Sequence, residues 1–152
     1  MLIRMRCCPS ILRLTALSLT VLMATSCASI GPSAPQPPDL TGTKWLAEDI
    51  GGQGVMDFLQ STLQFDAMDN SRVGGNSGCN NYFGAVAVDG WTIEFSAMGS
   101  TRMACPAAVM DQENRFLSAL SATNRYEWNP ETDLLHFYDD DESTLRFSRI
   151  AP

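Results

Sequence analysis

The stretch Gly75–Gly84, GNSGCNNYFG, is rich in glycine and asparagine and holds one cysteine within otherwise strand-like sequence. Four roles are open to Cys79 at its centre: a catalytic nucleophile, a metal ligand, one half of a disulfide, or a small apolar residue of the core. Each role belongs to a different class of protein. The segments on either side of the stretch are needed to choose among them.

Short segments around this stretch alternate polar and apolar residues with the period of two of a half-buried strand. Asp89-Gly90 separates two of them and favours a tight hairpin turn, because it supplies the left-handed backbone that such a turn needs. Seven strands are predicted, at residues 43–48, 62–65, 81–88, 91–95, 125–128, 134–138 and 143–148.

One segment has the period of a helix instead. Its residues at three- and four-residue spacing are Val109, Met110, Glu113, Phe116, Leu117 and Leu120. Pro106 can occupy the first turn, so we predict one main helix at about 106–120. The apolar stripe of this helix must be covered. The fold class is therefore α+β: a single β-rich domain with a curved, mainly antiparallel sheet of about seven strands packed with the helix.

The first 26 residues have the pattern of a lipoprotein-type signal peptide. Three arginines precede an uncharged, mostly apolar run of eleven residues, Leu14–Ala24. A membrane-spanning helix needs about 20 residues, so we expect residues 1–26 to be removed. Ala24-Thr25-Ser26-Cys27 resembles a lipobox, with alanine where an aliphatic residue is usual, and predicts that Cys27 carries lipid. Ordinary cleavage near Ser26, leaving a soluble secreted protein, is the alternative.

Residues 27–39 follow as a lipid-anchored, proline-rich segment, which we predict to be an extended tether. Residues 40–150 then have the size of one domain with one hydrophobic core. Without the signal arginines, 7 basic residues remain against 17 acidic ones, a formal net charge of −10. This charge repels phosphate backbones, so we expect no nucleic-acid partner and no direct electrostatic binding to anionic lipid.

Two blocks, Gly78–Gly84 (GCNNYFG) and Ser100–Pro106 (STRMACP), together resemble the signature of the META domain family, which includes the HslJ-like heat-shock lipoproteins of bacteria. The resemblance extends to Leu40–Trp45, Gln112–Leu120 and Leu145–Phe147, and so covers nearly the whole domain. The motif residues that it marks for a structural or binding role are Gly78, Asn80, Asn81, Tyr82, Gly84, Thr101, Arg102, Met103 and Pro106.

The resemblance implies a non-enzymatic module of the bacterial cell envelope, associated with stress response or antibiotic tolerance, without catalytic residues or a cofactor. We expect a periplasm-facing protein, held to the membrane by the lipid on Cys27, that binds an envelope protein or a small ligand. Ala28 is not the aspartate that retains many lipoproteins in the inner membrane, which favours the outer membrane. The alternative is a periplasmic protein that binds a small molecule or copper.

Catalysis is the last-ranked function. A nucleophilic Cys79 needs a base, and the one histidine, His136, lies between Leu135 and Phe137 in a predicted strand, where it points away from the core that these two face. The segment Gly75–Cys79 resembles the GxSxG elbow of hydrolases, but it lacks the last glycine and precedes a strand instead of a helix.

Metal binding has few candidate ligands. A closed zinc site takes four Cys or His ligands, and three remain after lipidation of Cys27: Cys79, Cys105 and His136. Copper(I) accepts thioethers, and Met98, Met103, Cys105 and Met110 cluster in the sequence, although methionine is more often a core residue. The acidic run Asp139–Glu142 lacks the spacing of an EF-hand, so we interpret it as a solvated turn.

A disulfide between Cys79 and Cys105 needs no further partner. Cleavage before Cys27 leaves three cysteines, and lipid on Cys27 leaves these two to pair in an oxidising compartment. Such a link is worth roughly 3–4 kcal/mol. We therefore predict a structural staple and no metal site.

Arg102 has two interpretations. It forms a buried ion pair with Asp111 or Glu113, next to a buried Met103, or it faces a ligand and binds a carboxylate.

Overall fold

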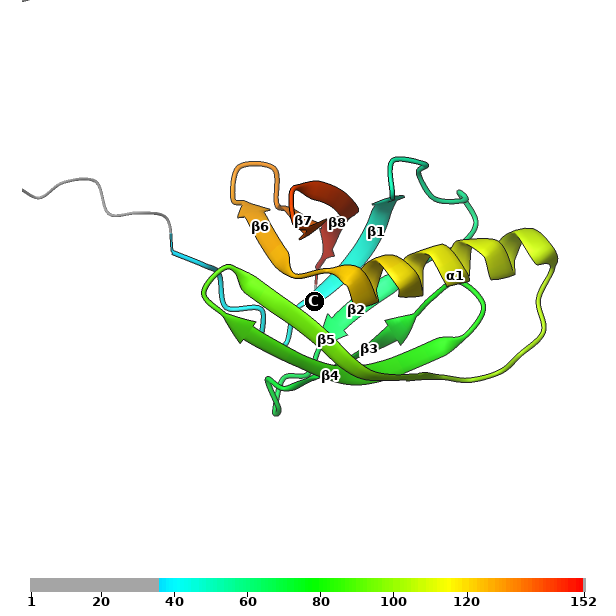
Figure 1. Ribbon diagram of the computed structural model, residues 1–152, viewed down its shortest axis with the longest axis horizontal. Helices are drawn as coiled ribbons and strands as arrows, with labels where there is room; N and C mark the ends of the chain where they lie inside the picture. The colour runs from blue at the N-terminus through cyan, green and yellow to red at the C-terminus, as the bar shows by residue number, and fades with distance from the viewer. Residues whose placement is uncertain (1–35, 152) are drawn as a thin grey trace, which may run out of the picture. The chain divides into compact units, whose positions relative to one another are not determined.

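The computed structural model describes residues 36–151 (Figure 1). The predicted signal peptide, Cys27 and the tether up to residue 35 lie outside the described residues. Eight strands and one helix follow one another along the chain: β1 (Lys44–Ile50), β2 (Thr62–Phe65), β3 (Arg72–Asn76), β4 (Asn81–Asp89), β5 (Thr92–Ser100), α1 (Ala107–Ala122), β6 (Arg125–Asn129), β7 (Leu134–Asp139) and β8 (Glu142–Ile150).

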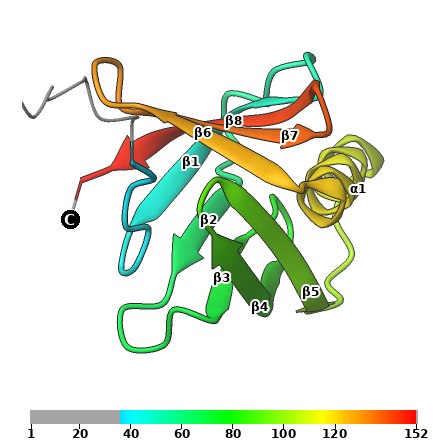
Figure 2. The ribbon, with the colours of Figure 1, turned by 60° about the vertical axis from the view of Figure 1, so that its left-hand side comes forward.

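The strands form a closed antiparallel barrel in which each strand pairs with its neighbour along the chain and β8 pairs with β1. Strand pairing is shortest between β5 and β6. Among the described residues these two strands share one cross-strand pair, Thr92–Arg125. The helix α1 connects these two strands, contacts β5 and β8, and lies where β5 and β6 diverge (Figure 2). It therefore covers the part of the barrel where strand pairing is shortest.

The interior of the barrel is filled by aromatic and aliphatic side chains from every strand. From α1, Phe116 reaches Tyr82 of β4 and Phe147 of β8, with ring centroids 5.7 and 6.2 Å apart. Phe116 and Leu120 are fully buried. The predicted apolar stripe of the helix thus packs into the core. Its aromatic contacts have the edge-to-face geometry that aromatic pairs prefer.

The single β-rich α+β domain with one helix is confirmed, and the structure has eight antiparallel strands where about seven were predicted. The missed strand is β3, with the sequence RVGGN. Its glycines lower strand propensity, yet the barrel requires one of them: a Cβ atom on Gly75 would lie 2.1 Å from the backbone oxygen of Thr62. Close approach of two backbones therefore overrides propensity at this position.

The helix is confirmed with slightly different bounds, Ala107–Ala122, and Pro106 is its N-cap instead of a residue of its first turn. The Asp89-Gly90 hairpin is also confirmed, with Gly90 at φ 59°. Among the residues that the structure describes, no helix has the length and apolar character needed to cross a membrane.

Candidate functional site

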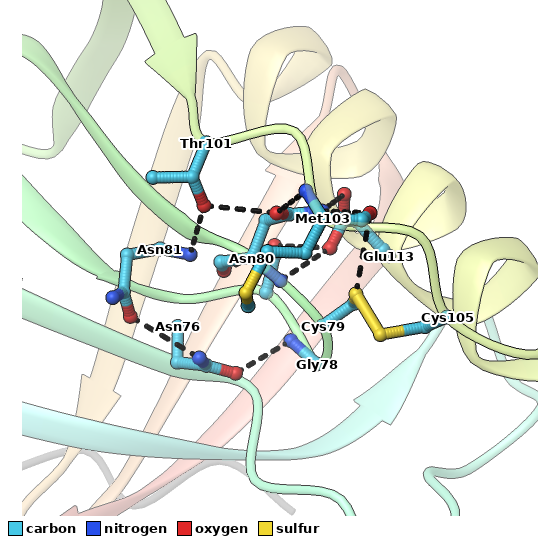
Figure 3. The surroundings of a disulfide bond; sticks show 10 residues. Asn76, Gly78, Cys79, Asn80, Asn81, Thr101, Met103, Cys105 and Glu113 are labelled. Atoms are coloured by element: carbon cyan, nitrogen blue, oxygen red, sulfur yellow. Dashed lines mark hydrogen bonds between the residues drawn. A yellow bond between two sulfur atoms is a disulfide. The ribbon is translucent and has the colours of Figure 1, made fainter.

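The two motif blocks meet at a disulfide between Cys79, just before β4, and Cys105, just before α1 (Figure 3). The Cα atoms of the two cysteines lie 6.2 Å apart. Neither sulfur is a thiolate in this state, so neither acts as a nucleophile or a metal ligand. The Sγ atom of Cys79 lies 3.6 Å from the carbonyl oxygen of Met103. This contact is not a hydrogen bond, because a disulfide sulfur has no proton to donate.

Asn80, next to the disulfide, uses its side-chain and backbone polar groups to join three segments. Its Oδ1 atom accepts hydrogen bonds from the Thr101 hydroxyl at 2.8 Å and from the Met103 amide at 2.7 Å. Its Nδ2 atom donates to Glu113 Oε1 at 2.9 Å, and its backbone N–H donates to Glu113 Oε2 at 2.8 Å. Its carbonyl oxygen accepts from the backbone of Ser77. The loop before β4, the loop after β5 and helix α1 are thereby tied together.

Glu113 is 4% exposed although it carries a carboxylate. No basic side chain of the described residues forms a salt bridge with it. The charge is instead solvated by the two Asn80 donors and by the Ser77 hydroxyl, whose oxygen lies 2.9 Å from Glu113 Oε2. The Ser77 oxygen is also 2.8 Å from the Asn80 carbonyl, and its single proton serves one of these acceptors at a time.

The pKa of Glu113 reports the balance of these effects. Burial alone would raise its pKa, because a carboxylate loses hydration in the interior, but the hydrogen bonds from Asn80 and Ser77 outweigh that loss and hold the pKa below its usual value. Glu113 is therefore an anion that accepts hydrogen bonds. We call Ser77, Asn80, Thr101, the Met103 backbone and Glu113 the Asn80 network.

A second set of contacts extends the Asn80 network along α1. Gln112 is fully buried; its Oε1 atom accepts from the Met56 amide at 2.8 Å, and its Nε2 atom donates to the Ser61 hydroxyl at 3.3 Å. Ser61 in turn donates to the Ser77 carbonyl at 3.1 Å. Within residues 36–151, no buried side-chain nitrogen or oxygen lacks a hydrogen-bond partner. The polar groups at this end of the barrel are thus satisfied by one another.

The remaining glycines and Tyr82 of the two blocks shape the same region. Gly78 has φ 124°, which favours glycine, and its N–H donates to Asn76 Oδ1 at 2.8 Å. At Gly84, a Cβ atom would lie 2.2 Å from the sulfur of Met98. Tyr82 is 3% exposed and donates to the Thr62 carbonyl at 2.8 Å.

Two expectations for the second block are wrong. Met103 is 55% exposed instead of buried. Arg102 is exposed and forms no salt bridge within the described residues, because Asp111 pairs with Arg115 and Glu113 is bonded to the Asn80 network. Asn80 bonds to Glu113 in place of Arg102, so the ion-pair interpretation of Arg102 is wrong, while its interpretation as a ligand-facing residue stays a prediction.

Phe83 is the large exposed residue of the first block, 63% exposed on the outer side of the barrel. Paired residues of neighbouring strands project to the same face of a sheet, and Phe83 belongs to a cross-strand row, Gln64–Gly74–Phe83–Gly99, that spans β2 to β5. The row has neighbours on both sides along the strands: Arg72, Ala85 and Ser96 on one, and Asn76 and Asn81 on the other. We call these nine residues the Phe83 face.

The other candidate residues lie elsewhere. His136 projects from β7 between Leu135 and Phe137, which are fully buried, as predicted, and it stacks on Tyr138. Burial and the nearby Arg146 lower the pKa of His136. Met98 packs against the core, where its sulfur occupies the space above Gly84. Within residues 36–151, no cluster of three or more His, Cys, Asp or Glu side chains is arranged to hold a metal ion.

Sequence reasoning missed the roles of three residues in the site: Ser77, Gln112 and Glu113. A signal for two of them is present, because Gln112 and Glu113 fall on the buried side of a helix that also carries Val109, Phe116 and Leu120. Buried polar groups need partners, and asparagine and serine in the preceding glycine-rich stretch supply them. The partner assignment itself needs the three-dimensional arrangement.

The fold and the site define a small β-barrel domain with one disulfide and one helix, which packs beside the junction of β5 and β6. The family model of the META domain matches residues 38–152, and the chain belongs to the META domain family. A protein from Burkholderia xenovorans, solved by NMR, is similar with a TM-score of 0.64 and 24% identity over 79% of this chain and 96% of that chain. A second NMR structure has a TM-score of 0.57 and 17% identity over 72% and 90%. Both likenesses concern the fold. No curated protein matches the sequence.

Proposed function

We propose that this META domain protein is a non-enzymatic binding module of the bacterial cell envelope that takes part in envelope stress response or antibiotic tolerance. It is anchored by lipid on Cys27, faces the periplasm and belongs to the outer membrane. Its partner is an envelope component that meets the outer surface of the barrel.

The observation that carries the proposal is that the polar residues of this region are bonded inside the protein, while two large apolar residues of the motif blocks are exposed. Asn80, Thr101 and Glu113 are committed to internal hydrogen bonds, and the ionised Glu113 has its oxygens occupied by donors. A general acid or base needs a free lone pair or proton near a substrate. Phe83 and Met103, by contrast, present apolar surface to the outside. This arrangement supports recognition in place of catalysis.

The disulfide supports the proposed location in the periplasm. A Cys79–Cys105 bond persists where the environment is oxidising, as outside the cytoplasm of most bacteria. It agrees with the export signal read from residues 1–26.

Capture in the native envelope tests the binding function. Full-length protein carrying a photo-crosslinker at position 85, on the outer surface, is expected to link to one envelope component in a saturable manner. The matched control carries the crosslinker at position 118 on the exposed side of α1. Conversion of an envelope component by the purified protein, lost in Glu113→Gln, would contradict a non-enzymatic role.

The anchor has its own test. Cys27→Ala is expected to move the protein from the outer-membrane fraction to the soluble periplasmic fraction, and mass spectrometry of the wild-type N-terminal peptide is expected to find acyl chains. Wild-type protein that is already soluble, with an unmodified peptide, would contradict the anchor and leave the binding function to be judged by capture.

A further inference from the structure

We infer that the Phe83 face is a carbohydrate-binding site for an uncharged oligosaccharide of pyranose rings. The inference rests on the proposed binding function and names the class of its ligand. It is drawn from the shape of the face, from the polar groups around it and from the pairing of its strands.

The first element is an aromatic platform. Phe83 is flanked by Gly74 and Gly99 in neighbouring strands, so no side chain stands beside the ring in its own row. A Cβ atom on Gly99 would lie 2.9 Å from Phe83 Cζ, so the tip of the ring leans toward β5 and occupies the space that a side chain at Gly99 would need. The face of an aromatic ring is electron-rich, and it therefore attracts the C–H groups that cover one side of a pyranose.

The second element is a hollow of about 260 Å³ over β2 and β3. It is lined by three polar residues, Gln64, Asp66 and Arg72, and by Val73, Gly74 and Gly75 of β3. Gly74 is paired with Phe83, so the hollow adjoins the platform. Two strand spacings, on the order of 10 Å, separate the hollow at β3 from the ring over β5, which fits an oligosaccharide of at least two rings.

The polar groups match hydroxyls. The amide of Gln64 and the guanidinium of Arg72 line the hollow, and on the other side of the ring the Asn76 and Asn81 amides are joined at 3.2 Å. Amides and guanidinium groups offer donors and acceptors in pairs, as neighbouring sugar hydroxyls do. Arg72 and Asp66 are opposite in charge, so the lining of the hollow has no net formal charge. Because the lining has no net charge, we expect an uncharged ligand.

The strand pairing disfavours an extended peptide. Peptides that bind to sheets add a strand to a free edge and are recognised by their main chain. Along the Phe83 face, β3 is paired with β2 and β4, and β4 is paired with β3 and β5. No free edge is present at this place, whereas a sugar needs only the side chains and the ring.

The backbone next to the platform is strained. Ala97 has φ 49°, which is unfavourable for a residue with a Cβ atom. It lies in the bulge of β5, where Phe83 pairs with Gly99 and Ala85 with Ser96. The extra residue brings a glycine opposite the ring. Backbone strain of this kind clusters at binding sites.

The test is a titration of full-length protein in a detergent without a sugar headgroup, followed by calorimetry and NMR. The probes are cellotetraose, maltotetraose and tetra-N-acetylchitotetraose, which are uncharged. At least one is expected to bind and to shift the signals of the Phe83 face. Phe83→Ala is expected to weaken binding by about tenfold or more, since an aromatic contact reaches the energy of one decade in affinity. Gly99→Ala, which keeps the ring but displaces it, is expected to weaken binding to a smaller extent.

Phe58→Ala is the matched control, because Phe58 is also an exposed phenylalanine, 75% exposed, but lies outside the Phe83 face. Its affinity is expected to equal that of wild type. Equal loss in Phe58→Ala and Phe83→Ala would overturn the site. Failure of all three sugars to bind would overturn the ligand class, and the proposed binding function would still stand if the crosslinker at position 85 captured an envelope protein. Failure of both experiments would overturn the two proposals together.

Discussion

Tyr82 and Phe83 are neighbours on β4 with opposite surroundings. Tyr82 is 3% exposed, bonds to the Thr62 carbonyl and packs edge-on against Phe116, whereas Phe83 is 63% exposed over Gly99. Successive residues of a strand project to opposite faces, so one motif block serves the interior and the outer surface at once. The inner side, with the Asn80 network, holds loops and helix together, and the outer side carries the exposed ring of Phe83.

Substitutions on the two sides of β4 are therefore expected to have different effects. Changes on the inner side are expected to lower the free energy of unfolding and to affect binding only through the fold. Changes on the outer side are expected to leave stability almost unaltered and to remove binding.

Among changes within the two motif blocks, loss of the disulfide is expected to have the largest effect on stability. Cys79→Ser, Cys105→Ser and the double substitution are each expected to lower the free energy of unfolding by roughly 3–4 kcal/mol, because each removes the same link. Urea denaturation of the three variants checks this, with wild type in reductant as the control. Clearly unequal losses for the two single variants would show that one cysteine has a further role.

Glu113→Ala is expected to follow, with a loss of about 3 kcal/mol. It leaves the Asn80 amide donors and the Ser77 hydroxyl without their acceptor in a buried place, and each unsatisfied group has a cost. Asp111→Ala is the matched control on the same helix, since the Asp111 side chain is 72% exposed and pairs with Arg115 at the surface. Equal losses in the two variants would contradict a central role for the Asn80 network.

The pH dependence isolates the charge of Glu113. The pKa of Glu113 is lower in the folded protein than in the unfolded chain, where it is about 4.3. Its contribution to stability is therefore fully present above that value and is lost as the pH falls through the folded pKa. Compared with wild type, Glu113→Gln is expected to show a shallower loss of stability below about pH 4.3. Parallel profiles in urea denaturation at a series of pH values would contradict this.

Much of the inner side could be predicted from the sequence. The helix and the Cys79–Cys105 link follow from local patterns: Phe116 and Leu120 recur at helical spacing, and two cysteines remain after lipidation of Cys27 is assumed. Burial of Glu113 was visible as an acidic residue on an apolar stripe. Its partners were not, because the backbone and side-chain N–H groups of one residue in a distant loop, Asn80, take the place of the suggested Arg102.

The outer side could not be predicted, and β3 is the reason. Gly74 and Gly75 lower its strand propensity, so the row that places Gly74 beside Phe83 is hidden until the strands are paired. The bulge at Ala97 shifts β5 and brings Gly99 opposite the ring. The register of strands depends on long-range pairing and on such bulges. Neither the pairing nor the bulge can be recognised from a short segment of sequence.

Tyr82→Phe is a smaller change on the inner side. It removes the hydroxyl that donates to the Thr62 carbonyl at 2.8 Å and keeps the ring, so the expected loss is about 1 kcal/mol. Tyr138→Phe is the control, because the Tyr138 hydroxyl makes a longer, exposed bond of 3.3 Å to Glu127. Thermal and urea unfolding are expected to separate the two variants, and identical values would show that the inner hydroxyl contributes nothing beyond a surface bond.

Phe83→Ala is expected to have the smallest effect on stability, less than about 0.5 kcal/mol, as for most surface substitutions. The ring is 63% exposed, and the space beneath it is the backbone of Gly99, so its removal opens no cavity. Phe116→Ala, which empties a fully buried site, is expected to cost about 3–5 kcal/mol under the same conditions. The contrast separates the two sides of β4 with one chemical change, phenylalanine to alanine. A loss of several kcal/mol in Phe83→Ala would mean that the outer ring is part of the packing, and the Phe83 face would then have to be explained by stability instead of recognition.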